Sequence, residues 1–146
     1  MRVLIDADGC PVVGITVEVC KKLNVECIIF CDTSHEFHFP DATVITVSRG
    51  ADSVDFALVN AIQNGDLVIT QDYGLAAMCQ ARNCRIINQD GMEYTGDNIN
   101  ALLTFRHDSK KLRRAGVRMH GMKKRSATKN DSFKIKLTDI LKEIIR

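Results

Sequence analysis

The sequence has 146 residues, of which 45% are hydrophobic and 26% are charged, and its formal net charge is +2. This length and composition are typical of one globular domain with a core of ordinary size. No segment approaches the roughly 20 apolar residues that a transmembrane helix needs, and the N-terminus lacks a signal-peptide pattern. We therefore expect a cytoplasmic protein that makes no membrane contact.

Short β-forming runs alternate with segments of helical spacing. The sequence predicts helices at about 11–23, 51–64, 73–82 and 98–115, and strands at 3–5, 25–30, 44–47, 67–70 and 85–87. The strands are apolar nearly throughout, which is typical of a parallel sheet covered on both faces. We therefore expect an α/β fold, a three-layer α/β/α arrangement with a mainly parallel central sheet. The stretch 31–42 has no clear period and is expected to be an irregular connection.

The chain divides by composition into three parts. Residues 1–115 form the α/β domain, residues 116–131 read as a basic loop or linker, and residues 132–146 as an amphipathic C-terminal helix. The helix places large apolar side chains on one face and is expected to pack on the same domain. A homo-oligomer is also compatible with this pattern.

Six cysteines are scattered among apolar residues without a C-x-x-C pair. This spacing predicts reduced thiols rather than a disulfide scaffold. Cys10 lies beside acidic residues and before Pro11, but we expect it to pack like the others rather than act as a nucleophile.

Two aspartates, Asp6 and Asp8, end the first predicted strand. In extended backbone, side chains at i and i+2 point the same way, so both carboxylates would face one spot. Carboxylates so close repel each other, and a divalent cation with oxygen ligands would relieve that repulsion. The plainer alternative is a strand-to-loop corner in which Asp accepts backbone N–H bonds.

Further aspartates follow other strands of the predicted sheet. Asp72 closes the fourth strand, while Asp52 and Asp55 begin the helix that follows the third. Ligands of open α/β sheets bind at the carboxyl ends of the strands, so the sequence predicts one metal site, with ligands Asp6, Asp8, Asp52, Asp55 and Asp72. Alternatively, Asp52 is a helix N-cap and Asp55 a first-turn acid.

Asp66 is excluded from this site because it begins the fourth strand, about 20 Å from Asp72. It is expected to accept hydrogen bonds in the turn after Gly65. The predicted ion is Mg²⁺ or Mn²⁺ rather than Zn²⁺, since neither Cys nor His joins the set at ligand spacing. His35 and His38 are expected at the surface. Asp32 is a secondary candidate for substrate contact.

The charge is unevenly distributed. Residues 1–105 hold 6 Lys/Arg against 14 Asp/Glu, whereas residues 106–130 hold 10 against 1. A solvated helix face usually mixes both signs, so the basic segment favours a phosphate-rich partner, nucleic acid and RNA before DNA. Aromatic residues are few, which favours contact with the nucleic-acid backbone. The predicted contact residues are Arg49, Lys110, Lys111, Arg113, Arg114, Lys123, Lys124 and Arg125.

Three motifs resemble the YaiI/YqxD family, namely Asp6-Ala-Asp-Gly-Cys-Pro-Val12, Gly50-Ala-Asp-Ser-Val-Asp55 and Gly65-Asp-Leu-Val-Ile-Thr-Gln-Asp72. The resemblance covers nearly the whole chain. It implies a fold similar to the PIN-like nucleases, in which clustered acids hold Mg²⁺ or Mn²⁺ and cleave RNA or DNA. By position, Asp6 and Asp8 match the family's first acidic motif, Asp52 and Asp55 the second, and Asp72 the third.

The leading hypothesis is a metal-dependent enzyme that hydrolyses phosphodiester bonds, with Asp6, Asp8, Asp55 and Asp72 as catalytic residues. Two alternatives stay open. One is a non-catalytic module that binds nucleic acid or a protein partner. The other is an aspartate-nucleophile phosphatase in which Asp6 attacks phosphorus, although Cys10 stands where that class has Thr.

Overall fold

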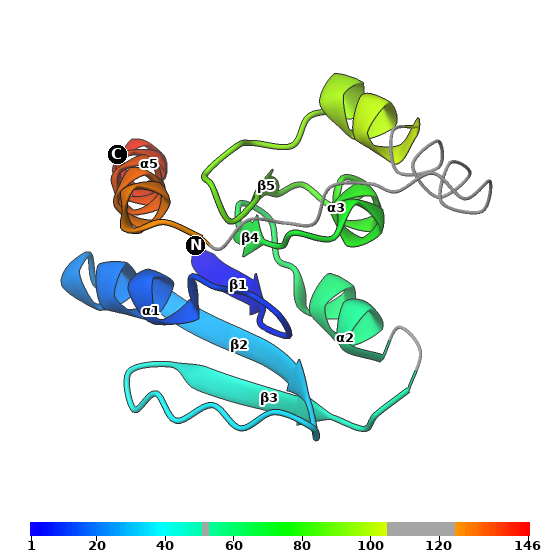
Figure 1. Cartoon of the computed structure of the whole chain (residues 1–146), viewed down its shortest axis with the longest axis horizontal. Helices are drawn as coiled ribbons and strands as arrows, with labels where there is room; N and C mark the ends of the chain where they lie inside the picture. Colours follow the sequence, from blue (N-terminus) through cyan, green and yellow to red (C-terminus); the bar gives the residue numbers. More distant parts are fainter. Residues whose placement is uncertain (51–52, 105–124) are drawn as a thin grey trace.

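The central sheet has five parallel strands (Figure 1). The computed structural model describes residues 1–50, 53–104 and 125–146. Within this sheet the strand order is β3-β2-β1-β4-β5. The strands are β1 (Arg2–Asp6), β2 (Glu26–Asp32), β3 (Thr43–Val47), β4 (Leu67–Ile69) and β5 (Arg85–Ile87). The predicted parallel sheet is confirmed.

Helices cover both faces of the sheet, so the predicted three-layer α/β/α arrangement with a C-terminal helix is also confirmed (Figure 1). One face packs against α1 (Val13–Lys22) and α5 (Ala127–Ile145). The other face packs against α2 (Ser53–Ala61), α3 (Tyr73–Cys79) and the helical residues 96–104. None of the helices in the described ranges is long and apolar enough to cross a membrane.

Side chains of β1 alternate between the two layers of core. Val3 and Ile5 pack on the side of α1 and α5, whereas Leu4 packs on the side of α2 and α3. All three side chains are fully buried. Burial on both faces explains why β1, β2 and β4 read as continuous apolar runs, whereas the edge strand β3 is partly exposed.

The sheet has a switch point between β1 and β4. From β1 the chain moves outward to β2 and β3, and then crosses back to β4 on the other side. Crevices in open α/β sheets form outside the carboxyl ends of strands at such a point. The residues that follow β1 and β4 therefore lie where a ligand-binding cavity is expected.

Strand β2 is longer than predicted. The sequence predicts its end at Phe30, but pairing with β3 continues through Asp32, which lies opposite Val47. Cys31 is fully buried, so the strand stays in the core for one more residue. The extension places the Asp32 backbone at the same edge of the sheet as Asp6, which lies opposite Phe30.

Several helix boundaries also differ from the prediction: α1 spans Val13–Lys22 rather than 11–23, α2 ends at Ala61 rather than 64, and α3 ends at Cys79 rather than 82. Helix α5 begins at Ala127 rather than 132, because the Ser126 hydroxyl caps it by accepting the N–H of Lys129 at 3.3 Å. It packs against α1 through Phe133, Leu137 and Leu141. The helix predicted at 98–115 is observed over residues 96–104, and its remaining part lies outside the described residues.

Candidate functional site

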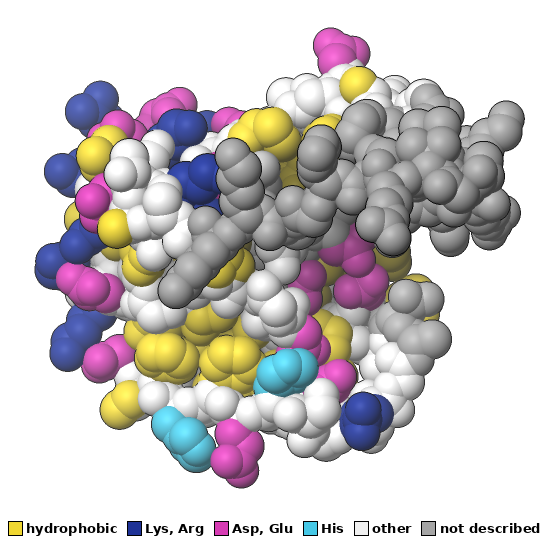
Figure 2. All heavy atoms as spheres, viewed as in Figure 1, with side chains coloured by type: hydrophobic (Ala, Val, Ile, Leu, Met, Phe, Trp, Pro, Cys, Tyr) yellow, Lys and Arg dark blue, Asp and Glu magenta, His cyan; other side chains and the backbone are white. Residues whose placement is uncertain are grey.

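The carboxyl edge of the sheet carries an open cavity of about 600 Å³. Its lining comes from the ends of β1 and β2, the start of α2 and the segment after β4. The described lining residues are Asp6, Asp8, Asp32, Gly50, Ser53, Val54, Asp55, Gln71, Asp72 and Tyr73. Figure 2 shows carboxylates gathered at this hollow beside a histidine, whereas most of the described Lys and Arg side chains lie over α1 and α5.

Asp8 lies in a tight turn directly after β1. The N–H of Cys10 donates to the carbonyl of Ala7 at 3.0 Å, which closes the turn. Gly9 has φ of +75°, a conformation that glycine adopts without a steric penalty. The Gln71 side-chain amide donates to the Gly9 carbonyl at 2.7 Å, so the turn after β1 is tied to the segment after β4.

Asp6 is the last residue of β1 and lines the cavity. Its Oδ2 accepts a hydrogen bond of 2.8 Å from the hydroxyl of the buried residue Thr70. Burial is the largest cause that raises the pKa of the Asp6 carboxyl to about 6; the Thr70 hydrogen bond opposes it, and the negative charges of Asp55, Asp72 and Asp8 add to it. These three carboxylates are therefore close enough to influence Asp6.

Asp72 also caps a helix, a role that the sequence did not indicate. Its Oδ1 accepts the backbone N–H groups of Gly74 at 2.8 Å and Leu75 at 3.3 Å, at the start of α3. Asp55 lies in the first turn of α2, in agreement with its predicted position, and lines the cavity. Whether these residues bind a metal stays a prediction. Asp52 lies outside the described residues.

A histidine joins the acidic residues, which we did not expect. His35 Nδ1 lies 2.8 Å from Asp8 Oδ1 and 3.4 Å from Asp32 Oδ1. These three side chains offer ligand atoms that all lie within 4.8 Å of one another, the only such His/Cys/Asp/Glu group found in the described residues. The expectation that no histidine joins the acidic set is therefore wrong. Both histidines lie at the surface, as predicted, with 47% of the His35 side chain and 84% of the His38 side chain exposed.

The longer strand β2 explains why the sequence reading missed this group. With the strand ending at Asp32, the Asp32 N–H donates to Asp8 Oδ2 at 3.2 Å. The Asp32 side chain accepts the Ser34 N–H at 2.8 Å and the Ser34 hydroxyl, and these hydrogen bonds lower the pKa of its carboxyl. The tight turn they form brings His35 back toward Asp8. The Asp32-Thr-Ser34 turn pattern was the available signal.

Of the residues predicted to contact nucleic acid, the structure describes Arg49 and Arg125. Arg49 is exposed. The guanidinium of Arg125 donates to Asp90 Oδ1 at 2.7 Å and also to Asn130 and the Gln89 carbonyl, and only 18% of its side chain is exposed. These contacts leave it few donors for a phosphate. Lys110, Lys111, Arg113, Arg114, Lys123 and Lys124 lie outside the described residues.

Asp66 lies at the opposite end of β4 and has a structural role, as predicted. Only 1% of its side chain is exposed, and it forms an ion pair of 2.8 Å with Arg2. It also accepts the Gln63 N–H at 2.7 Å in the turn before β4. The six cysteines are free thiols. Burial raises the pKa of Cys10 to about 11, which does not favour a nucleophilic thiolate at neutral pH.

The donor atoms of the cavity fit a divalent cation. Asp8 Oδ1 is buried, and no donor in the described part of the chain gives it a hydrogen bond of good geometry, although His35 Nδ1 is 2.8 Å away. A buried carboxylate oxygen in this state is costly unless a positive charge lies near it. Carboxylate oxygens are the ligands that Mg²⁺ and Mn²⁺ prefer, whereas an imidazole nitrogen favours transition metals over Mg²⁺, so the reason given above for excluding Zn²⁺ no longer holds at the His35 corner of the cavity.

Residues 4–143 match the family described as "Uncharacterized BCR, YaiI/YqxD family". The chain is similar to the UPF0178 protein of Exiguobacterium sibiricum, with 46% identity over 98% of each chain. It is 45% identical to that of Ruminiclostridium cellulolyticum over 91% of this chain and 87% of the relative, and 41% identical to that of Lachnoclostridium phytofermentans over 99% of both. No solved structure matches. The chain therefore belongs to the YaiI/YqxD family.

Proposed function

We propose that this protein is a metal-dependent enzyme that hydrolyses phosphodiester bonds in nucleic acid, with RNA favoured over DNA. One observation carries the proposal: five aspartates from four separate segments line one open cavity at the carboxyl edge of a parallel sheet. Two of those segments, after β1 and after β4, flank the switch point of the sheet, where ligands of such folds bind. The names of the relatives state no activity, so this geometry is the main support.

The resemblance to PIN-like nucleases agrees with this proposal. Asp6, Asp8, Asp55 and Asp72 are the proposed catalytic and metal-binding residues, and Asp52 is a further proposed ligand. A bound Mg²⁺ or Mn²⁺ would supply charge neutralisation at the scissile phosphate and a water of lowered pKa. No protein nucleophile is needed, because a carboxylate not used as a ligand can orient the attacking water.

Hydrogen bonds fix the Asp6 and Asp72 carboxylates in position, which favours a role for them in a binding or catalytic site. Thr70 bonds to Asp6 Oδ2, and Asp72 is held by two backbone N–H groups of α3. Side chains fixed by surrounding hydrogen bonds lose little entropy when they bind a metal or orient water. Loop carboxylates that serve only solubility do not need such support.

We propose that Arg49 and the basic residues Lys110, Lys111, Arg113, Arg114, Lys123 and Lys124 hold the nucleic-acid backbone. Binding should then weaken steeply as salt is added, because neutralised phosphates release counterions. Arg125 is omitted from this surface because its guanidinium is already bound to Asp90. A cytoplasmic location suits such a substrate.

The test is cleavage of a 5′-labelled single-stranded RNA by purified protein with Mn²⁺, with Mg²⁺ and with EDTA. We expect metal-dependent cleavage by wild type and a loss of at least about 100-fold in Asp6→Asn and Asp72→Asn, a scale set by the loss of charge stabilisation at the reacting phosphate. Asp66→Asn is the matched control, since it removes a carboxylate from the far end of β4. Full cleavage by Asp6→Asn would refute the proposal.

The same assay separates the alternatives. RNA that is bound but not cut, with either metal, would indicate a non-catalytic module. A phosphoryl group trapped on Asp6 after incubation with a phosphomonoester would indicate the phosphatase chemistry.

A further inference from the structure

We propose that His35 supplies a nitrogen ligand, together with Asp8 and Asp32, to a divalent transition-metal ion, and that this ligand makes the cavity prefer Mn²⁺ over Mg²⁺. The inference rests on the metal site proposed above and names the metal that this site takes. It is carried by the juxtaposition of one imidazole nitrogen and two carboxylate oxygens at the β1–β2 corner of the cavity.

The separations of the ligand atoms fit one ion. Ligands about 2.1 Å from an octahedral cation and at right angles to each other lie about 3 Å apart. His35 Nδ1 lies 2.8 Å from Asp8 Oδ1 and 3.4 Å from Asp32 Oδ1, which brackets this value. The ligand atoms of the group are all within 4.8 Å of one another, a separation that ligands on one ion can have.

Asp8 Oδ1 is placed where a positive charge would stabilise it, and its described neighbour for this role is the His35 ring. This oxygen is buried and receives no hydrogen bond of good geometry from the described residues, despite the imidazole nitrogen 2.8 Å away. That nitrogen also lies 3.2 Å from the Ser34 hydroxyl oxygen and 3.4 Å from Asp32 Oδ1. Asp32 Oδ1 already accepts the Ser34 N–H and the Ser34 hydroxyl, so Asp8 Oδ1 is the oxygen of this group left without a hydrogen bond from the described residues. One cation could bind both carboxylates and the imidazole nitrogen at once.

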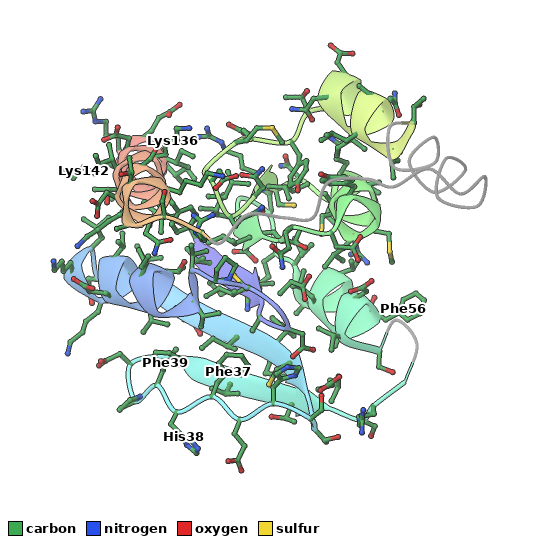
Figure 3. The ribbon with its side chains drawn as sticks, viewed as in Figure 1. Phe37, His38, Phe39, Phe56, Lys136 and Lys142 are labelled. Carbon is green, nitrogen blue, oxygen red and sulfur yellow. The ribbon has the colours of Figure 1, made fainter. Side chains whose placement is uncertain are left out.

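The loop holds the His35 ring in place. The rings of His35 and Phe37 are stacked, with centroids 6.3 Å apart and an angle of 27° between their planes. Phe37 and Phe39 pack against the core next to α1, while His38 points away from the protein (Figure 3). The alternation of core-facing and solvent-facing side chains along the loop therefore gives His35 and His38 different surroundings, although they are three residues apart.

The donor set decides the choice of metal. Mg²⁺ prefers oxygen ligands and keeps several waters, so an imidazole adds little to its affinity. Mn²⁺ also accepts carboxylates, and as a first-row transition metal it gains more from a nitrogen ligand than Mg²⁺ does, although less than the later metals of the series. A site with two carboxylates and one imidazole should therefore discriminate against Mg²⁺.

The experiment is pulsed electron paramagnetic resonance of the full-length protein with Mn²⁺ at pH 7.5. We expect a ¹⁴N coupling in wild type that is replaced by a ¹⁵N coupling when the histidines are ¹⁵N-labelled. The coupling should be lost in His35→Gln and retained in His38→Gln, the matched control on the same loop. Wild type without nitrogen coupling, or His35→Gln with the wild-type signal, would overturn the inference.

Calorimetry gives a second readout. We expect His35→Gln to weaken Mn²⁺ binding by about tenfold or more, the scale on which even outer-shell partners of a metal act, and to change Mg²⁺ binding far less. Asp32→Asn should also weaken Mn²⁺ binding. This variant removes one carboxylate ligand and keeps the imidazole of His35. Equal losses for both metals in His35→Gln, or no Mn²⁺ binding by wild type at millimolar concentration, would contradict the inference.

These outcomes are distinguishable from failure of the proposed function. Nitrogen coupling from His35 in a protein that does not cleave RNA would support the His35 ligand and refute the nuclease proposal. Metal-dependent RNA cleavage by a protein whose Mn²⁺ has only oxygen ligands would support the nuclease proposal and refute the His35 ligand.

Discussion

Thr70 holds Asp6 in place: its buried hydroxyl donates a hydrogen bond of 2.8 Å to Asp6 Oδ2. The same hydroxyl oxygen accepts the backbone N–H of Asp72 at 3.0 Å. One side chain at the end of β4 thus links the end of β1 to the start of α3, across the switch point of the sheet. The relative position of Asp6 and Asp72 therefore depends on Thr70.

Replacing Thr70 by valine, which has nearly the same shape, should raise the pKa of Asp6. The Thr70 hydrogen bond favours the ionised carboxylate, and its loss leaves burial and the neighbouring negative charges unopposed. The variant should also lose about 1–3 kcal/mol of stability, since the Asp72 N–H loses its acceptor. The measurement is a ¹³C NMR titration of the Asp6 carboxyl in metal-free protein. Thr70→Ser keeps the hydroxyl and should leave this pKa near its wild-type value.

The pKa of Asp6 also predicts how metal-free protein responds to pH. Since the folded pKa is about 6 and the ordinary value 3.8, the folded state binds the proton more tightly, and stability falls as pH rises from about 4 through 6. The full penalty above pH 6 corresponds to roughly 3 kcal/mol. Asp6→Asn removes the titrating charge. In EDTA it should therefore be more stable than wild type at pH 8.

The comparison at low pH is the control for this prediction. At pH 4, close to the ordinary value of 3.8, the Asp6 carboxyl is protonated in the folded chain and largely so in the unfolded chain, so the advantage of Asp6→Asn should shrink to a small part of its value at pH 8. Urea denaturation of both proteins at pH 4 and pH 8 measures the two differences. An advantage that is equal at the two pH values would show that it does not come from this carboxyl.

Replacing Asp66, at the opposite end of β4, should lower the stability of the protein without changing its affinity for metal. Asp66→Asn leaves the Arg2 guanidinium without its charged partner in a site where Asp66 is 1% exposed, so the variant should lose about 3 kcal/mol in urea denaturation. Its Mn²⁺ affinity, measured by calorimetry below the unfolding transition, should equal that of wild type. A folded Asp66→Asn protein that no longer binds Mn²⁺ would contradict the assignment of Asp66 as structural.

The layout of the fold could be predicted because its signals are local and repeated. Apolar runs of strand length alternate with helical spacing, and burial of Val3, Leu4 and Ile5 on two faces is what a parallel sheet requires. The same logic places Asp6, Asp55 and Asp72 at one edge of the sheet, where they line one cavity.

The part of the site that could not be predicted depends on loop geometry. Asp8 faces the cavity from a turn that needs the positive φ of Gly9, rather than from extended backbone as the i, i+2 argument assumes. His35 reaches Asp8 only because β2 runs to Asp32 and the chain then turns at Ser34. Strand ends are read from the sequence with an uncertainty of a few residues. That uncertainty is enough to hide a ligand contributed by the next turn.

Salt dependence should separate residues that contact phosphate from those that hold the fold. Lys110→Gln combined with Lys111→Gln should lower the slope of log affinity against log salt for single-stranded RNA by about 1.4, since each phosphate contact contributes about 0.7. Arg125→Gln should leave the slope unchanged, because its guanidinium is bound to Asp90 and Asn130. It should instead cost about 1–3 kcal/mol of stability through the lost charge-assisted hydrogen bonds. A lower slope in Arg125→Gln, at unchanged stability, would place Arg125 on the RNA after all.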